Sequence, residues 1–110
     1  GADKVLDFTY IDDAVAGVQA CLERVAVGDP SVVGNTFNLA HGTGHRLLEV
    51  VDLIGRTLGR TPELRVEPSR PGEVTWYVAD ISKARDAFGY DPQVPVTAGV
   101  PRAIREAQPA

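Results

Sequence analysis

The sequence predicts a small mixed α/β fold in which helices and strands alternate along 110 residues. Some windows carry apolar residues three or four positions apart, which is typical of amphipathic helices. Others are short, rich in β-forming residues and bounded by turn residues, as strands are. The predicted order is strand, helix, strand, helix, strand, turn, helix, helix. Residues 1–110 therefore form one small unit, either a domain or part of a larger one.

The first predicted pair of elements is a strand followed by a helix. Residues 6–11 are short and β-rich. Asp12 and Asp13 then offer an N-cap and first-turn carboxylates, which are favourable at the positive end of a helix dipole. Apolar residues at positions 15, 18, 22 and 25 predict an amphipathic helix over 13–26, ended by Gly28. The first strand has no evident neighbour, so we expect the piece to dock on a larger sheet.

The remaining elements follow from the same patterns. Residues 36–40 read as a short buried strand and 41–45 as a turn, and an apolar stripe predicts a helix over 47–58 closed by Gly59. Alternating charged and apolar residues at 63–67 predict a half-buried strand. After a turn at Arg70, Ser82 begins a helix that ends at Phe88, and Thr97 begins a last helix through about residue 107.

Composition excludes several classes of partner. The net charge is −4 and the pI is near 5.0, whereas nucleic acids and anionic membranes favour basic proteins. No run of about 18 apolar residues predicts a spanning helix. The single cysteine, Cys21, excludes an intramolecular disulfide, and we expect a buried, reduced thiol and a cytoplasmic location. The chain contains no Met and opens close to a predicted strand, so we expect a piece of a longer protein.

The segment from Ser69 to Arg85 carries the most chemistry. A guanidinium (Arg70), a Pro-Gly turn, a carboxylate (Glu73) and a phenol (Tyr77) lie within eight residues. Arginine offers planar, bidentate donors to phosphate oxygens, and glutamate accepts hydrogen bonds from a sugar diol. This combination suits a ligand with phosphates and vicinal hydroxyls. Alternatively, Arg70 is a surface arginine paired with Glu67 or Glu73, Glu73 is a solvated carboxylate, and Tyr77 is a core aromatic.

The other candidate groups favour plain structural roles. Trp76 is expected to contribute packing area. His41 and His45 are four residues apart, a spacing that suits a metal only on a helix, and two glycines intervene, so we expect no metal site. The Asp12–Asp13 pair is expected to cap a helix, and nothing in the sequence activates Cys21 as a nucleophile.

Several motifs together resemble the C-terminal part of the NAD-dependent epimerase/dehydratase family, the extended short-chain dehydrogenases that act on nucleotide sugars. They occur in family order at residues 6–15, 34–40, 47–50, 70–73 and 79–84. The resemblance implies a parent with an N-terminal Rossmann domain, a glycine-rich turn for NAD(H) and a Tyr-x-x-x-Lys pair. This chain has neither motif, so we expect the substrate-binding end of an enzyme, without catalytic or cofactor-binding residues.

The resemblance also implies site residues. Arg70 matches the arginine that grips the substrate diphosphate, Glu73 the acidic residue that holds the ribose hydroxyls, and Tyr77 a tyrosine near the diphosphate. Leu6 departs from the family, because many sugar-nucleotide epimerases have a phosphate-binding arginine immediately before the Asp-Phe pair.

Two functions are compatible with these residues. The first is the nucleotide-sugar-binding region of an epimerase or dehydratase, with a parent expected to be a homodimer and a fragment expected to self-associate. The second is part of a catalytically silent NAD-binding relative that acts as a regulator or interaction module. Leu6, in place of the phosphate-binding arginine, favours this second function.

Overall fold

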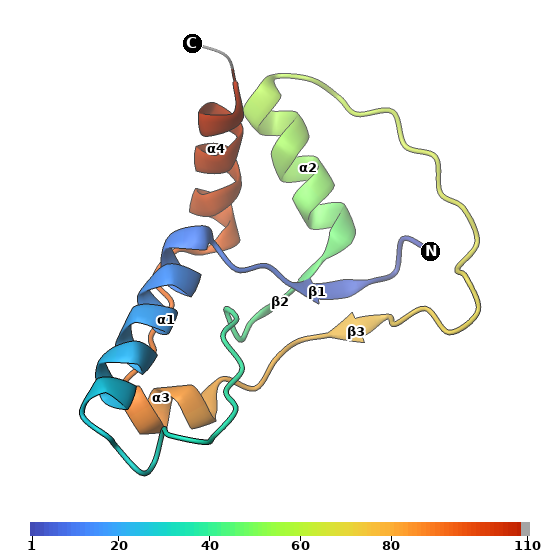
Figure 1. Ribbon diagram of the computed structural model, residues 1–110. Helices are drawn as coiled ribbons and strands as arrows, with labels where there is room; N and C mark the ends of the chain where they lie inside the picture. Colours follow the sequence, from blue (N-terminus) through green and yellow to red (C-terminus); the bar gives the residue numbers. More distant parts are fainter. Residues whose placement is uncertain (109–110) are drawn as a thin grey trace.

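Three short strands form a mixed sheet at the centre of the computed structural model, which describes residues 1–108 (Figure 1). The sheet order is β2-β1-β3, with β1 antiparallel to β2 and parallel to β3. The elements in chain order are β1 (Val5–Asp7), α1 (Ile11–Ala26), β2 (Gly44–Arg46), α2 (Leu47–Leu58), β3 (Trp76–Tyr77), α3 (Ser82–Phe88) and α4 (Val96–Ala107). The predicted mixed α/β arrangement and all four helices are confirmed.

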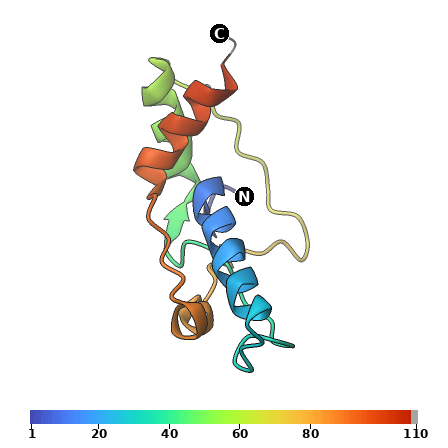
Figure 2. The same cartoon turned by 60° about the vertical axis from the view of Figure 1, so that its left-hand side comes forward.

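Two helix pairs flank the sheet. α2 packs against α4, and α1 packs against α3 at the other end of the molecule (Figures 1 and 2). Gly59 and Gly89 end α2 and α3 in left-handed conformations, with φ of 67° and 71°, as their places in the sequence predict. Pro101 lies inside α4. No helix among residues 1–108 has the length and hydropathy needed to cross a membrane.

The strand predictions were wrong in detail. Residues 36–40 are not a strand, and the ladder strand β2 lies instead at 44–46, where we expected a turn. Residues 63–67 belong to a long connection without strand structure, and β3 follows the Arg70 turn. A strand is defined by backbone hydrogen bonds to a neighbour, and neither 36–40 nor 63–67 has such a neighbour in the described chain.

The helix starts also differ from prediction. α1 begins at Ile11, with Tyr10 at the N-cap position, so neither Asp12 nor Asp13 caps it. α3 follows Ile81, and the Ser82 side chain does not cap it; the Ser82 backbone N–H donates to Asp80 Oδ1 at 2.9 Å instead.

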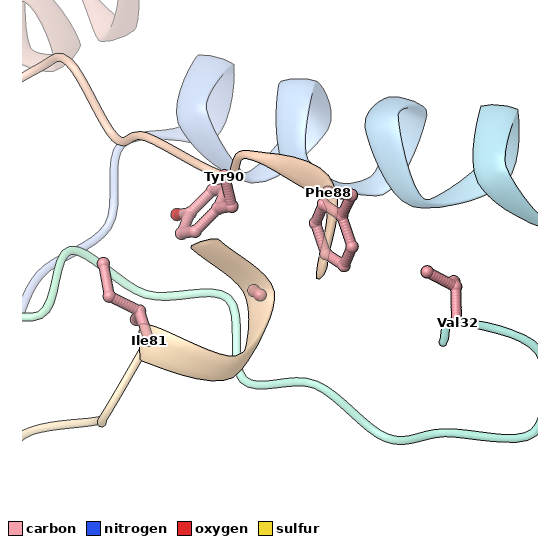
Figure 3. Packing of buried hydrophobic residues seen from close by; sticks show 5 residues of the cluster. Val32, Ile81, Phe88 and Tyr90 are labelled. Atoms are coloured by element: carbon pink, nitrogen blue, oxygen red, sulfur yellow. The ribbon is translucent and has the colours of Figure 1, made fainter. Parts of the chain in front are cut away.

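The main core lies between α1, α3 and the extended segment before β2. Its buried members are Val32, Ile81, Ala84, Phe88 and Tyr90 (Figure 3). Tyr90 packs against α1 so closely that a Cβ at Gly17 would lie 2.8 Å from its ring. The Tyr90 hydroxyl donates to the Ala40 carbonyl at 2.7 Å. Cys21 packs against this cluster but is only partly buried, which corrects the expectation of a buried thiol.

The molecule is flat and open. It measures 52 × 41 × 18 Å, and its radius of gyration is 17.0 Å, whereas a compact domain of this length has about 13 Å. Its accessible surface is 7658 Å², against about 5,900 Å² for a compact monomer of this mass. Part of the excess is the apolar stripe of α1, which is uncovered as we expected. Its members, 45–61% exposed, are Ile11, Val15, Val18, Leu22 and Val25.

Trp76 is also exposed, at 67%, so the prediction that it packs in a core was wrong for the described chain. Trp76 lies on β3, an edge strand of only two residues that are both exposed. This edge of the sheet is therefore not enclosed by a hydrophobic core in the described chain.

Candidate functional site

The turn Arg70–Glu73 is closed by two hydrogen bonds. The Glu73 backbone N–H donates to the Arg70 carbonyl at 3.0 Å, and the Arg70 backbone N–H donates to Glu73 Oε2 at 3.2 Å. Pro71 and Gly72 occupy the middle of the turn, and Gly72 adopts a φ of 79°, which favours glycine. The turn therefore fixes the backbone from which both predicted ligand-binding side chains project.

The Glu73 carboxylate is also held from the start of the chain. Lys4 Nζ donates to Glu73 Oε1, and the Gly1 ammonium lies 3.6 Å from Oε2. The Lys4 hydrogen bond is the main reason that the pKa of Glu73 falls to about 2. Glu73 is thus an ionised acceptor over the whole physiological pH range, and the reading of it as a merely solvated carboxylate does not describe this structure.

Arg70 is free of such partners. No carboxylate among residues 1–108 lies within 4.0 Å of its guanidinium. Neither alternative pairing is seen within residues 1–108: Glu67 lies 3.5 Å from Arg65, and Glu73 pairs with Lys4. Its exposed guanidinium is available to an anion.

Tyr77 stands on β3 directly opposite Leu6 of β1. Its side chain is 69% exposed, so the core role that we kept open for it is wrong for the described chain. The fold therefore brings Glu73 and Tyr77 to the same edge of the sheet, beside Lys4 and Leu6. No hydrogen bond joins the side chain of Arg70 to that of Tyr77 within residues 1–108.

The aspartates that we expected to cap a helix have different roles. Asp13 is buried, and its two oxygens accept the backbone N–H groups of Gln93 and Val94 at 2.8 and 3.0 Å. This carboxylate fixes the segment before α4 to the first turn of α1. Asp12 is exposed and lies 4.0 Å from Arg102.

A second carboxylate, which the sequence analysis missed, organises the centre of the fold. Asp7 of β1 accepts backbone N–H bonds from His41, Gly42 and Ala79 at 2.8, 2.9 and 3.3 Å. The signal was present in the sequence, because aspartate is disfavoured within an apolar strand unless its oxygens have partners.

The histidines form no metal centre in the part of the chain that is described. No group of three or more potential ligands occurs among residues 1–108. His45 Nδ1 instead lies 3.5 Å from Glu49 on the first turn of α2.

Two hollows lie outside the predicted site. An apolar hollow of about 510 Å³ opens between the residues that lead into α1 and those that lead into and form α4, including Phe8, Tyr10, Val94 and Val100. A polar hollow of about 260 Å³ is lined by His41, Asp80 and Arg85 among others. Arg70, Glu73 and Tyr77 line neither of these two hollows.

Comparison with known proteins finds similarity to part of several longer enzymes. No protein-family model matches it. Individual relatives do: it is 37% identical over 98 residues to the uncharacterised UDP-glucose epimerase YtcB of Bacillus subtilis, covering 89% of this chain and 29% of that protein. Its fold matches epimerase Mth375 of Methanothermobacter thermautotrophicus with a TM-score of 0.84 and 27% identity, over 96% of this chain and 30% of that one. The chain is therefore similar to the C-terminal part of nucleotide-sugar epimerases.

A third match carries bound molecules. UDP-glucuronic acid 4-epimerase of Bacillus cereus, in complex with UDP-glucuronic acid and NAD, gives a TM-score of 0.82 at 27% identity, over 97% of this chain and 34% of that one. The family members thus resemble this chain over about a third of their own length, in their C-terminal part. The predicted fold class, a mixed α/β portion of a Rossmann-type enzyme, is confirmed.

Proposed function

We propose that this chain is the nucleotide-sugar-binding region of an NAD-dependent epimerase or dehydratase, with Arg70, Glu73 and Tyr77 as its ligand-binding residues. The observation that carries the proposal is the Arg70–Glu73 turn, because it presents an unpaired guanidinium beside a fixed, ionised carboxylate. The relatives support the class of ligand, since one of them is an epimerase in complex with UDP-glucuronic acid and NAD.

In this proposal the chain acts by binding and orientation. Arg70 donates charge-assisted hydrogen bonds to the diphosphate, Glu73 accepts from the ribose hydroxyls, and Tyr77 lies against the ligand beside β1. Binding energy from these remote groups holds the sugar in place for a reaction performed elsewhere. The chain itself contributes no group that exchanges a proton with the sugar.

We propose that this chain has no cofactor site of its own. NAD sites of this kind use a glycine-rich turn that leads from a strand into a helix N-terminus. The nearest sequence, Gly42-Thr43-Gly44, precedes α2, but Gly44–Arg46 pair with β1 as strand β2 and do not form a phosphate-binding turn. We propose that the longer parent protein binds NAD(H) and performs the proton transfer outside this chain. We also propose that the parent is cytoplasmic and homodimeric.

A thermal-shift screen of the full-length gene product tests the function. UDP-, dTDP-, GDP- and ADP-sugars are compared with NAD present, and one nucleotide class is expected to raise the melting temperature. A matched Arg70→Ala variant should lose that shift while keeping its NAD-dependent stabilisation. The absence of any nucleotide-sugar shift in a protein that NAD stabilises would contradict the proposal.

Leu6 favours one alternative, a catalytically silent relative that regulates or binds other proteins. The sequence upstream of Gly1 separates the two. An intact glycine-rich turn and Tyr-x-x-x-Lys support the enzyme, and their loss supports the silent module.

A further inference from the structure

Lys4 pairs with a residue of the candidate site, and the sequence alone gave it no role. Its ammonium donates to Glu73 Oε1 across 69 residues of sequence. Both side chains are largely shielded, with 22% and 20% of their surfaces exposed. A lysine in a loose surface ion pair moves among many rotamers, whereas this one is confined by the backbone around it.

Two backbone bonds fix Lys4. The Leu47 N–H donates to the Lys4 carbonyl at 2.9 Å, and the neighbouring Val5 N–H donates to the Thr75 carbonyl at 2.8 Å. The peptide that joins Lys4 to Val5 is therefore bonded on both sides, to the start of α2 through the Lys4 carbonyl and to the segment before Tyr77 through the Val5 N–H. Residues two apart on a strand share a face, so Lys4 and Leu6 lie on the same face. Lys4 thus supplies a positive charge on the face where Leu6 replaces the arginine of many sugar-nucleotide epimerases.

We propose that Lys4 is a positioning residue of this nucleotide site: it orients the Glu73 carboxylate, and through it the Arg70 turn, toward a ribonucleoside diphosphate. The inference rests on the proposed function. Among the side chains of residues 1–108, Lys4 supplies the positive charge that faces Glu73, and the Arg70 backbone N–H is a further donor.

The geometry selects a class of ligand. An ionised carboxylate has about four acceptor sites. Lys4 occupies one on Oε1, and the Arg70 N–H occupies one on Oε2, so each oxygen keeps a free lone pair. Two adjacent free acceptors match the 2′- and 3′-hydroxyls of a ribose. Lys4 thereby makes the site prefer ribonucleotides to 2′-deoxyribonucleotides.

The test compares wild type with Lys4→Met, Lys4→Arg and Arg105→Met, a variant that removes an equal charge from the exposed side of α4. Calorimetry on the full-length gene product measures the affinities for UDP and 2′-deoxy-UDP. NMR titration of the Glu73 carboxyl and the melting temperature are measured on the same variants. A Glu73→Gln variant and its double variant with Lys4→Met complete the set.

Wild type should prefer UDP to 2′-deoxy-UDP by about tenfold, the effect of one hydrogen bond to a charged acceptor. Lys4→Met should reduce this ratio toward one and raise the Glu73 pKa from about 2. Lys4→Arg should restore part of the ratio, and Arg105→Met should leave it unchanged. Lys4→Met should change nothing further in the Glu73→Gln background, because the two residues act through one contact.

Contrary results are distinguishable. A folded Lys4→Met protein with the wild-type UDP to 2′-deoxy-UDP ratio overturns the positioning role and leaves the proposed function intact. A wild type that binds neither UDP nor UDP-sugars overturns the proposed function and the positioning role with it, even where the NMR titration detects the Lys4–Glu73 pair.

Discussion

Replacing Asp13 should destabilise the chain far more than replacing its neighbour Asp12. Asp13 is 5% exposed and accepts two backbone N–H groups at 2.8 and 3.0 Å. Hydrogen bonds to a charged group contribute about 1.5–3 kcal/mol each, so Asp13→Ala should cost about 3–6 kcal/mol. Asp13→Asn keeps one carbonyl oxygen as acceptor and should cost about 1.5–3 kcal/mol.

Asp12 provides the matched control. It is exposed and lies 4.0 Å from Arg102, so Asp12→Asn should change stability by no more than about 0.5 kcal/mol. The assay is urea unfolding of dilute protein followed by circular dichroism, with the slope m compared between variants. If both aspartates only served the helix start, the two asparagine variants would lose similar amounts. Equal losses would therefore refute the bonding role of Asp13.

The remaining predictions concern the candidate site and the uncovered surface. In the full-length gene product, Arg70→Ala should weaken nucleoside-diphosphate binding roughly ten- to several-hundred-fold. Arg70→Lys should recover only part of the lost affinity. Unchanged affinity in a folded Ala variant would show that Arg70 is an ordinary surface residue. Residues 1–110 alone should bind no NAD and show no epimerase or dehydratase activity; saturable NAD binding in a calorimeter would contradict this. Light scattering should show that the same chain forms dimers or larger species through the exposed apolar stripe of α1. Leu22→Glu should shift this equilibrium toward monomer. A monomeric wild type with a sharp melting transition would contradict self-association through α1. The folded-state pKa of Glu73 is about 2 and its ordinary value is 4.5, so the Lys4–Glu73 pair stabilises the fold above about pH 4.5. In wild type this stabilisation should be lost as the pH falls from 4.5 to 2. In Lys4→Met it should be absent.

Sequence patterns predicted the helices well because helices are local. The apolar spacing in 13–26 and 47–58, with glycines at positions 59 and 89, encodes each helix and its end without reference to the rest of the chain. Strands need a partner, and their prediction failed for that reason. Residues 36–40 are β-rich but extended and unpaired, whereas 44–46 contain two unlikely strand residues, Gly44 and His45, and still pair with β1.

The candidate site was predicted in part. Arg70, Glu73 and Tyr77 lie within one short segment, so residue chemistry and resemblance were enough to select them. Lys4 was not selected, because only the parallel pairing of β1 with β3 brings it to Glu73. Asp13 was misassigned because its partners are 80 residues away, and a carboxylate at a helix start has a common local explanation.

The buried Asp13 and the partly buried Asp7 have a consequence for how this sequence can vary over evolution. Asp7 and Asp13 recruit only main-chain donors, at positions 41, 42, 79, 93 and 94. Nineteen of the twenty amino acids provide that donor, so positions 93 and 94 are free to drift while the aspartates are not, whereas Gly42 is confined to glycine by its φ of 83°. Proline is the one residue forbidden there. The chain already places Pro92 and Pro95 on either side of the two donors and never on them. Relatives should therefore differ widely in the side chains at 93 and 94, and an inserted proline should be as harmful as losing the aspartate.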